Sequence, residues 1–206
     1  MTDVINATNE YIKELFLIDS EEDKFVYRYE HTLRTAAIGQ KIAKEEGLNE
    51  EALVLACLLH DIGYVECVTH EDYDTHGKIS SRMAREYLES SHYDQEWIDT
   101  ITYGILAHTE EQPERKLTVF EISIADADNI DRFDAYRLYE FLRFSDLEKK
   151  TSSQMLELAQ KRHHRLVELR DYPNGSKTAD LMWKDKIDFQ LGYYERLISQ
   201  MSASIM

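Results

Sequence analysis

Apolar residues recur every three or four positions along most of this chain, which is the period of an amphipathic helix. Short alternating runs rich in β-branched residues, the pattern of a half-buried strand, are scarce, and there are only 7 Gly and 2 Pro. The pattern predicts an all-α protein. The predicted helices cover about 3–17, 27–46, 49–61, 75–88, 94–108, 117–130, 132–144, 153–170 and 178–201.

Residues at the ends of these segments match known helix boundaries. Gly47 is a helix stop, Asn49 and Thr75 stand where N-caps are expected, and Asp94 is expected to open a helix. The stretches between helices include a charged linker, Asp19–Lys24, and two loops that we expect to lie over a functional site, Tyr64–Asp74 and Thr109–Lys116.

The pair His60-Asp61 closes the most apolar run of the chain, residues 52–59, and precedes Gly63. An ionised carboxylate at the end of a buried helix is costly unless it is paired or bound to a metal. The pair therefore indicates a metal or catalytic site. The alternative is a capping Asp beside a partly exposed His.

Two further positions extend this pair into a recognisable pattern, because His31 lies upstream and Asp128 downstream, each on a predicted helix. The pattern His31, His60-Asp61, Asp128 resembles the HD superfamily of metal-dependent phosphohydrolases, over roughly Phe25 to Phe133. The resemblance implies a single domain over 1–206: an HD-domain helical bundle at about 25–133, with a helical C-terminal extension at about 134–206. It also implies that these four residues bind a metal.

The last ligand has two candidates, Asp126 and Asp128. Aligning the family pattern on Ala127-Asp128 fits best, and a shift of two residues turns a helical side chain by about 200°, so both cannot face one metal from a regular helix. Two imidazoles and two carboxylates suit Mn, Fe, Co, Ni or Zn better than Ca. We expect one or two such ions per chain.

His76 and His108 stand where some HD families place extra ligands, at the start and end of predicted helices. In those families two metals are bound and the Asp that corresponds to Asp61 bridges them. Alternatively, His76 and His108 bind substrate phosphate or relay protons. The resemblance thus makes Asp61, His76 and His108 the catalytic candidates, with Asp61 in reach of both metal and nucleophile.

Three basic residues are candidates for binding a substrate phosphate. Arg34 lies three residues after His31 on the same helical face, although an ion pair with Glu30 explains it equally well. Lys78 follows His76 and is expected at the mouth of the site. Asn129 stands where the family commonly has a basic residue, and Arg132 is the substitute we expect.

The formal net charge of −16 predicts no nucleic-acid partner and no membrane surface, because both carry negative charge. A small phosphorylated substrate is compatible, since bound cations reverse the local sign of a site. Only two cysteines, Cys57 and Cys67, and no apolar leader or long apolar stretch favour a cytoplasmic protein. The extension is a candidate surface for a homodimer.

The resemblance as a whole implies hydrolysis of a small phosphate ester, a nucleotide above all, by attack of metal-activated water on phosphorus. Two alternatives use the same fold. One is a non-catalytic HD module that senses a nucleotide or a metal, and the other is a di-iron oxygenase with His76 and His108 as ligands.

Overall fold

A computed structural model of the protein describes residues 2–17, 23–91, 93–109 and 114–205. These residues form α-helices and short 3-10 helices and contain no strand, so the predicted all-α class is confirmed. The elements are α1 (Asp3–Leu17), α2 (Asp23–Glu46), α3 (Glu50–Leu59), η1 (Ile62–Val65), α4 (His70–Asp74), α5 (His76–Ser90), α6 (Gln95–Ala107), α7 (Val119–Asp131), α8 (Ala135–Phe144), η2 (Leu147–Lys149), α9 (Ser152–Leu169) and α10 (Lys177–Ala203).

The chain divides into two compact units, Met1–Asn129 and Ile130–Met206. The first unit holds α1 to α6 and most of α7, and the second holds α8 to α10. The predicted organisation as one domain, with an HD core at about 25–133 and an extension at about 134–206, stays a prediction.

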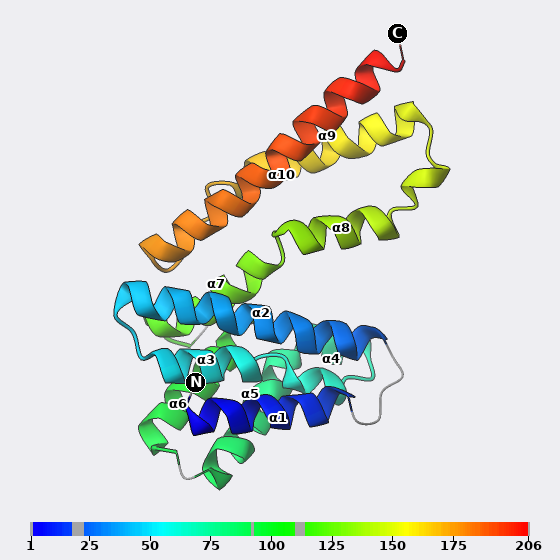
Figure 1. Ribbon diagram of the computed structural model, residues 1–206. Coiled ribbons are helices and arrows are strands. Elements are labelled where there is room, and N and C mark those ends of the chain that lie inside the picture. The colour runs from blue at the N-terminus through cyan, green and yellow to red at the C-terminus, as the bar shows by residue number, and fades with distance from the viewer. Residues whose placement is uncertain (1, 18–22, 92, 110–113, 206) are drawn as a thin grey trace. The chain divides into compact units, whose positions relative to one another are not determined.

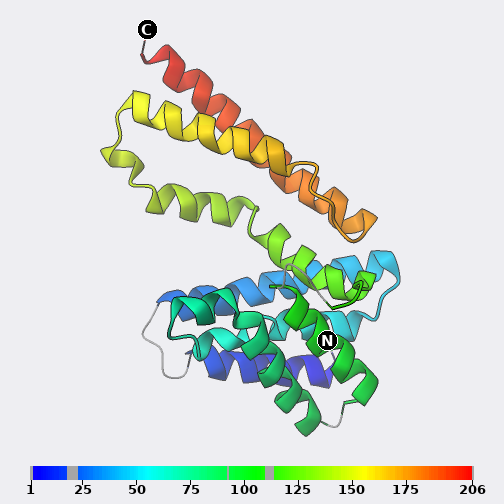
Figure 2. The same ribbon diagram turned by 180° about the vertical axis from the view of Figure 1, so that it is seen from behind.

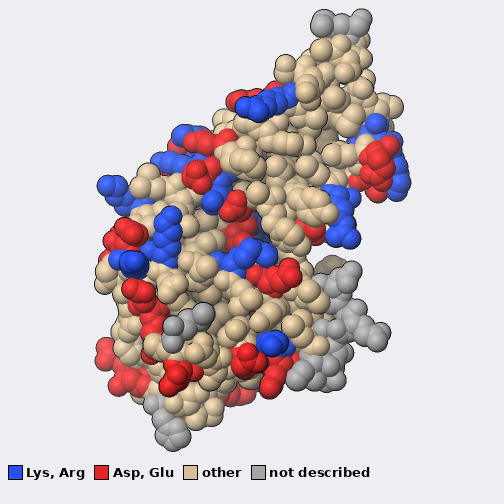
Figure 3. Space-filling model, in the orientation of Figure 1, with Lys and Arg blue, Asp and Glu red and all other residues tan. Residues whose placement is uncertain are grey.

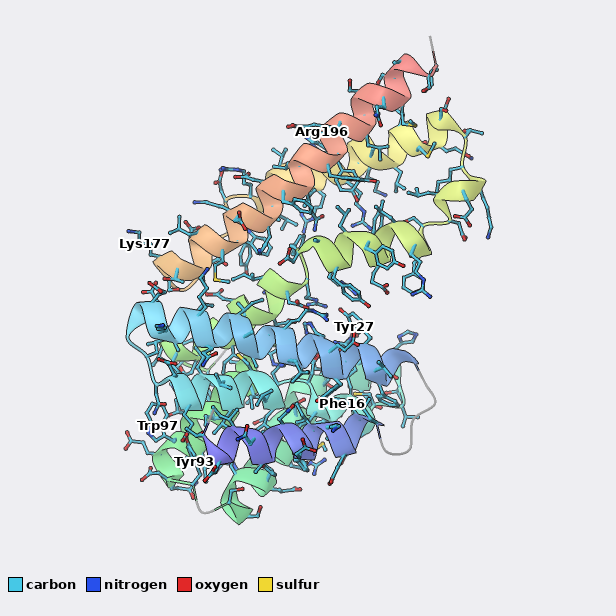
Figure 4. The ribbon with its side chains drawn as sticks, in the orientation of Figure 1. Phe16, Tyr27, Tyr93, Trp97, Lys177 and Arg196 are labelled. Atoms are coloured by element: carbon cyan, nitrogen blue, oxygen red, sulfur yellow. The ribbon has the colours of Figure 1, made fainter. Side chains whose placement is uncertain are left out.

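The first unit is built around α3. All eight residues from Ala52 to Leu59 are buried, because α3 packs against α1, α2, α5 and α6. A helix that is apolar on every side needs such enclosure. Helices α1 and α2 lie on one face of the unit, and α5 and α6 lie on the opposite face (Figures 1 and 2). Phe16 on α1, labelled in Figure 4, is 1% exposed and belongs to this core.

Of the two predicted N-caps, Asn49 is confirmed, and Asp94, predicted to open a helix, is also an N-cap. The side chain of Asn49 accepts a hydrogen bond from the Ala52 amide, and that of Asp94 accepts one from the Glu96 amide. Thr75 precedes α5 but does not cap it, because its hydroxyl donates instead to the Glu71 carbonyl.

The predicted loop Tyr64–Asp74 is wrong in part, since it contains η1 and the short helix α4. A capping box forms α4: the Thr69 hydroxyl accepts from the Asp72 amide, and the Asp72 carboxylate accepts from the Thr69 amide. The spacing of this pair is a signal that was present in the sequence. The linker 19–24 and the loop 109–116 lie partly outside the described residues.

The second unit is a helical assembly in which α9 and α10 run side by side (Figure 1). The indole of Trp183 on α10 is buried and donates to the Leu169 carbonyl at 2.8 Å. The Gln190 amide, also on α10, donates to the Phe133 carbonyl at 2.7 Å. None of the described helices of either unit has both the length and the apolar character that crossing a membrane requires.

Candidate metal centre

Five helices of the first unit deliver imidazole and carboxylate groups to one place. Four of the groups come from helix ends, where the chain turns, and two come from within α2 and α7. The residues are His31 on α2, His60 and Asp61 after α3, His76 at the start of α5, His108 after α6 and Asp128 on α7. The structure thus brings together every residue that the sequence marked as a metal ligand.

His31, His60 and Asp128 form a first group, in which the possible ligand atoms all lie within 4.8 Å of one another. Nε2 of His31 lies 3.0 Å from Oδ1 of Asp128, and Nε2 of His60 lies 3.9 Å from the same oxygen. All three residues are buried. Such convergence of nitrogen and oxygen donors is the arrangement that a transition metal requires.

Asp61 lies between this group and a second one. Its Oδ2 atom is 3.7 Å from Nε2 of His31. Its Oδ1 atom is 3.1 Å from Nε2 of His76, 3.5 Å from Nε2 of His60 and 3.9 Å from Nε2 of His108. The ion-pair distances therefore connect Asp61 to all four of these histidines.

The second group consists of His60, Asp61 and His108, again with ligand atoms within 4.8 Å of one another. His76 joins it, because its Nε2 atom is 3.2 Å from Nε2 of His108. Gly77 permits this approach of α5 to α6. A Cβ atom there would meet the Thr109 hydroxyl, and it would lie 3.2 Å from the Ile105 carbonyl oxygen.

Backbone hydrogen bonds orient three of the imidazoles. In each, Nδ1 faces the carbonyl oxygen of the residue three positions earlier, so that Nε2 faces the centre. The pairs are His60 with Cys57 at 2.7 Å, His76 with Tyr73 at 2.8 Å and His108 with Ile105 at 2.5 Å. Nε2 of His60 is buried and has no hydrogen-bond partner among the described residues. Leaving a buried nitrogen unsatisfied is costly, and a bound metal would satisfy it.

Burial sets the charge state of the imidazoles. It lowers the pKa of His60, although the carboxylates of Asp61 and Asp128 act in the opposite direction. Burial, together with the nearby His60, lowers the pKa of His108 to about 4. Both rings are therefore neutral at neutral pH, and a neutral ring offers a lone pair to a metal.

The carboxylate of Asp61 stays ionised despite its burial. Burial by itself raises its pKa, but the charge of His60, the hydrogen bond from His76 and the charge of Arg28 outweigh burial and hold the pKa well below the usual range. Because a neutral His60 contributes no charge, the permanently charged Arg28 is the contribution that persists at neutral pH.

Arg28 is a member of the site that the sequence analysis missed. Its Nη1 atom donates to Oδ2 of Asp61 at 2.7 Å, and its guanidinium lies 3.7 Å above the ring of Tyr64. Arg28 lies three residues before His31, so the helical spacing that singled out Arg34 applies to Arg28 as well.

The predicted phosphate-binding residues have different surroundings. Arg34 is half-buried on α2, one turn beyond His31, and Lys78 is exposed on α5. Arg132 is exposed and belongs to the second unit. Their roles in binding substrate stay predictions.

Asp126 and Asp128 are both buried on α7. Only Asp128 belongs to a group of potential ligand atoms within the part of the chain that the structure describes. The two-residue offset on one helix turns the Asp126 side chain to a different side of α7.

Gly63 explains how the chain turns after the His60-Asp61 pair. Gly63 lies where the chain turns after α3, and a glycine is needed there because the backbone comes close to α5. A Cβ atom at Gly63 would lie 2.6 Å from the Ser80 amide nitrogen and 2.8 Å from the His76 carbonyl oxygen. The Gly63 amide donates to the Ser80 hydroxyl at 2.9 Å, and this contact keeps α5, with His76, beside Asp61.

Comparison with known proteins gives a consistent picture. The profile of the HD domain family matches residues 28–132. Ribonuclease Y of Geobacter sulfurreducens is 32% identical over 99 residues, which cover 48% of this chain and 17% of that protein. An uncharacterized protein of Clostridium beijerinckii is 30% identical over 106 residues, which cover 50% of this chain and 66% of that protein. This chain thus spans only a small part of the ribonuclease Y relatives.

Two solved structures resemble the fold. The crystal structure of an HD-superfamily hydrolase from Bacillus thuringiensis has a TM-score of 0.72 at 16% identity and covers 98% of both chains. That of a predicted HD superfamily hydrolase from an uncultured Thermotogales bacterium has a TM-score of 0.67 at 18% identity, covering 95% of this chain and 91% of that one. At such identities the likeness shows the fold.

Proposed function

This chain belongs to the HD domain family, and on that premise we propose that it is a metal-dependent phosphohydrolase acting on a small phosphate ester, such as a nucleotide. The observation that carries the proposal is the convergence of four imidazoles on Asp61, with Asp128 beside His31 and His60 and with Nε2 of His60 buried and unsatisfied. A cluster that served only to stabilise the fold would not leave a buried nitrogen without a hydrogen-bond partner.

The ligand set supports two metal positions. His31, His60, Asp61 and Asp128 would hold the first metal, and His76 and His108, together with Asp61, would hold a second. The mixed nitrogen and oxygen donors favour Mn, Fe, Co, Ni or Zn. When bound, such a metal lowers the pKa of a water molecule and polarises a phosphoryl oxygen.

The protein's own groups position the reactants. Asp61 is ionised and accepts a hydrogen bond from the attacking water, which orients that water toward phosphorus. Arg28 holds Asp61 through one N–H group, and a guanidinium has five donors, so it can bind a phosphate oxygen at the same time. The stacking of Arg28 on Tyr64 keeps the guanidinium in place.

The charge of the first unit favours a small substrate over a polymer. Residues 1–129 carry 11 Lys and Arg against 28 Asp and Glu, a formal charge of −17. This charge repels an extended polyanion more strongly than a single phosphate ester. The name ribonuclease Y describes the longer relatives, so RNA belongs in the substrate panel as a comparison.

The test is metal content per chain, by elemental analysis of protein purified without chelators, followed by hydrolysis assays with nucleotides, p-nitrophenyl phosphate and RNA. We expect about two transition metals per chain and release of phosphate from small esters. About one metal would remove His76 and His108 from the ligand set.

Asp61→Ala is expected to lose both the metal and the activity, whereas the control Asp171→Ala, at an exposed position of the second unit, keeps both. Failure to take up Mn, Fe, Co, Ni or Zn, or full activity of Asp61→Ala, would disprove the proposal.

A further inference from the structure

The two units of the chain differ sharply in charge. The second unit, residues 130–206, contains 13 Lys and Arg and 12 Asp and Glu, which gives a formal charge of +1 against −17 for the first unit. The net charge of −16 for the whole chain therefore comes entirely from the first unit. The net charge of the second unit therefore does not repel nucleic acids or other polyanions.

A groove in the second unit gathers basic and aromatic side chains. Its volume is about 630 Å³, and it is formed by the end of α8, the turn that contains η2 and the middle of α9. We call it the α8–α9 groove. The residues that matter for its chemistry are the cations Lys150, Lys161, Arg162 and Arg165, the phenyl rings of Phe141 and Phe144, and one carboxylate, Asp146.

Helical spacing explains why these side chains face one groove. Arg165 lies four residues after Lys161 and three residues after Arg162. This spacing places Arg165 beside both of them on one side of α9. Phe141 and Phe144 are three residues apart and share a side of α8 in the same way. The groove therefore has a cationic wall on α9 and an aromatic wall on α8. Figure 3 shows Lys and Arg side chains beside Asp and Glu side chains where α8 turns toward α9.

The positive charge of the groove is largely not neutralised within the protein. Among the described residues, no ion pair joins Lys150, Lys161 or Arg162 to an acid, and Arg165 contacts only the exposed Glu168, at 3.1 Å. The carboxylate of Asp146 is paired with Lys149, outside the groove, at 3.0 Å. Four cations against one paired carboxylate attract an anion.

The aromatic wall offers a stacking surface. Phe144 is 73% exposed, which is unusual for a side chain of this size, and the ring of Phe141 already carries the Arg162 guanidinium at 3.7 Å. Exposed rings beside basic side chains are the arrangement with which proteins bind nucleotides, since the ring stacks on the base and the cations contact the phosphate. The volume lies within the range of small-molecule sites, about 300–1,000 Å³.

We propose that the α8–α9 groove binds a nucleotide unit, that is a phosphate linked to a planar base, either free or within a single-stranded oligonucleotide. Lys150 and Lys161 contact the phosphate, and Phe144 stacks on the base. The groove lies entirely within the second unit, so this binding requires neither the metal centre nor the activity proposed for it.

The test is fluorescence anisotropy with two probes, a fluorescent ADP analogue and a short fluorescein-labelled oligouridylate, in the presence of a chelator. Lys150→Glu/Lys161→Glu is compared with Lys177→Glu/Arg196→Glu, which makes the same change in net charge at exposed positions of α10 labelled in Figure 4. We expect the groove variant to bind at least tenfold more weakly and the α10 variant to change by less than about threefold, because only the first removes phosphate contacts.

Phe144→Ala, at an exposed position, is expected to weaken binding about fivefold or more through loss of stacking. Circular dichroism checks that each variant is folded. Binding of the ADP analogue supports a free nucleotide as the ligand, and binding of the oligouridylate alone supports a single strand.

Asp61→Ala separates this inference from the proposed function, since groove binding persists in that variant. Loss of binding in Asp61→Ala together with retention in Lys150→Glu/Lys161→Glu would assign the nucleotide to the metal centre and overturn the inference. So would failure of both probes to bind. A change of oligomeric state in Lys150→Glu/Lys161→Glu without probe binding would assign the groove to the acidic surface of a second copy.

Discussion

Nε2 of His31 on α2 and Oδ1 of Asp128 on α7 lie 3.0 Å apart in the interior of the first unit. The imidazole is fully buried and the Asp128 residue is 8% exposed. This contact brings the first and last residues of the pattern found in the sequence into one cluster with His60. It is also the geometric reason to choose Asp128 over Asp126 as the last ligand.

Asp128→Ala and Asp126→Ala test that choice as a matched pair, since both remove a buried carboxylate from α7. We expect Asp128→Ala to reduce metal content by at least tenfold, and Asp126→Ala to keep it, because only Asp128 faces His31 and His60. Elemental analysis of both variants after metal loading measures the difference. The reverse result would place Asp126 at the metal.

Arg28→Gln tests the guanidinium that contacts Asp61. The variant loses a charge-assisted hydrogen bond of 2.7 Å and the cation placed for the substrate phosphate, so we expect kcat/KM to fall about 10- to 100-fold. Arg82→Gln is the control, because Arg82 is an exposed arginine paired with Glu66 and Glu86. Steady-state kinetics, with metal content measured in parallel, distinguish lost phosphate binding from lost metal. Unchanged kinetics in Arg28→Gln would remove this residue from the mechanism.

Gly63→Ala tests the close approach of the turn after Asp61 to α5. The added methyl group would collide with the Ser80 amide, so we expect a loss of about 1–3 kcal/mol in the free energy of unfolding. Gly192→Ala is the matched control, because nothing lies within 4 Å of a Cβ atom there and alanine favours the helix. Urea denaturation measures both. If Gly63→Ala and the wild type had the same free energy of unfolding, α5 would be able to move away from the added methyl group without loss of stability.

Glu121→Gln tests the pH dependence of stability. Burial alone raises the pKa of Glu121, but hydrogen bonds from Arg115 and Thr118 outweigh it and lower the pKa below the ordinary value of 4.5. Because the folded state keeps this carboxylate ionised longer than the unfolded state does, its contribution is complete above about pH 4.5 and is lost as the pH falls further. We expect Glu121→Gln to lower Tm at neutral pH and to flatten the fall of Tm in acid. Thermal melts from about pH 7 to about pH 3 measure this. An equally steep fall in the variant would assign the acid sensitivity to other carboxylates.

Several residues of the candidate site were predictable because they stand at positions that the local sequence pattern marks, such as the ends of helices. His60 and Asp61 end an apolar run, and His76 and His108 stand at helix ends. Arg28 was missed, although its spacing from His31 equals that of Arg34, because spacing along a helix does not tell which of two neighbours contacts Asp61. The two-metal arrangement and the substrate-binding roles stay predictions.

The sequence by itself determined the helices, because their signals are local: the apolar period, the caps at Asn49 and Asp94 and the glycine at Gly47 act within a few residues. Only the tertiary structure decided which distant groups meet. It brought Asp128 to His31 and His60, brought Arg28 to Asp61 and placed cations of α9 in one groove with the exposed Phe144. These contacts join residues from different helices, and their distances depend on packing that no local pattern encodes.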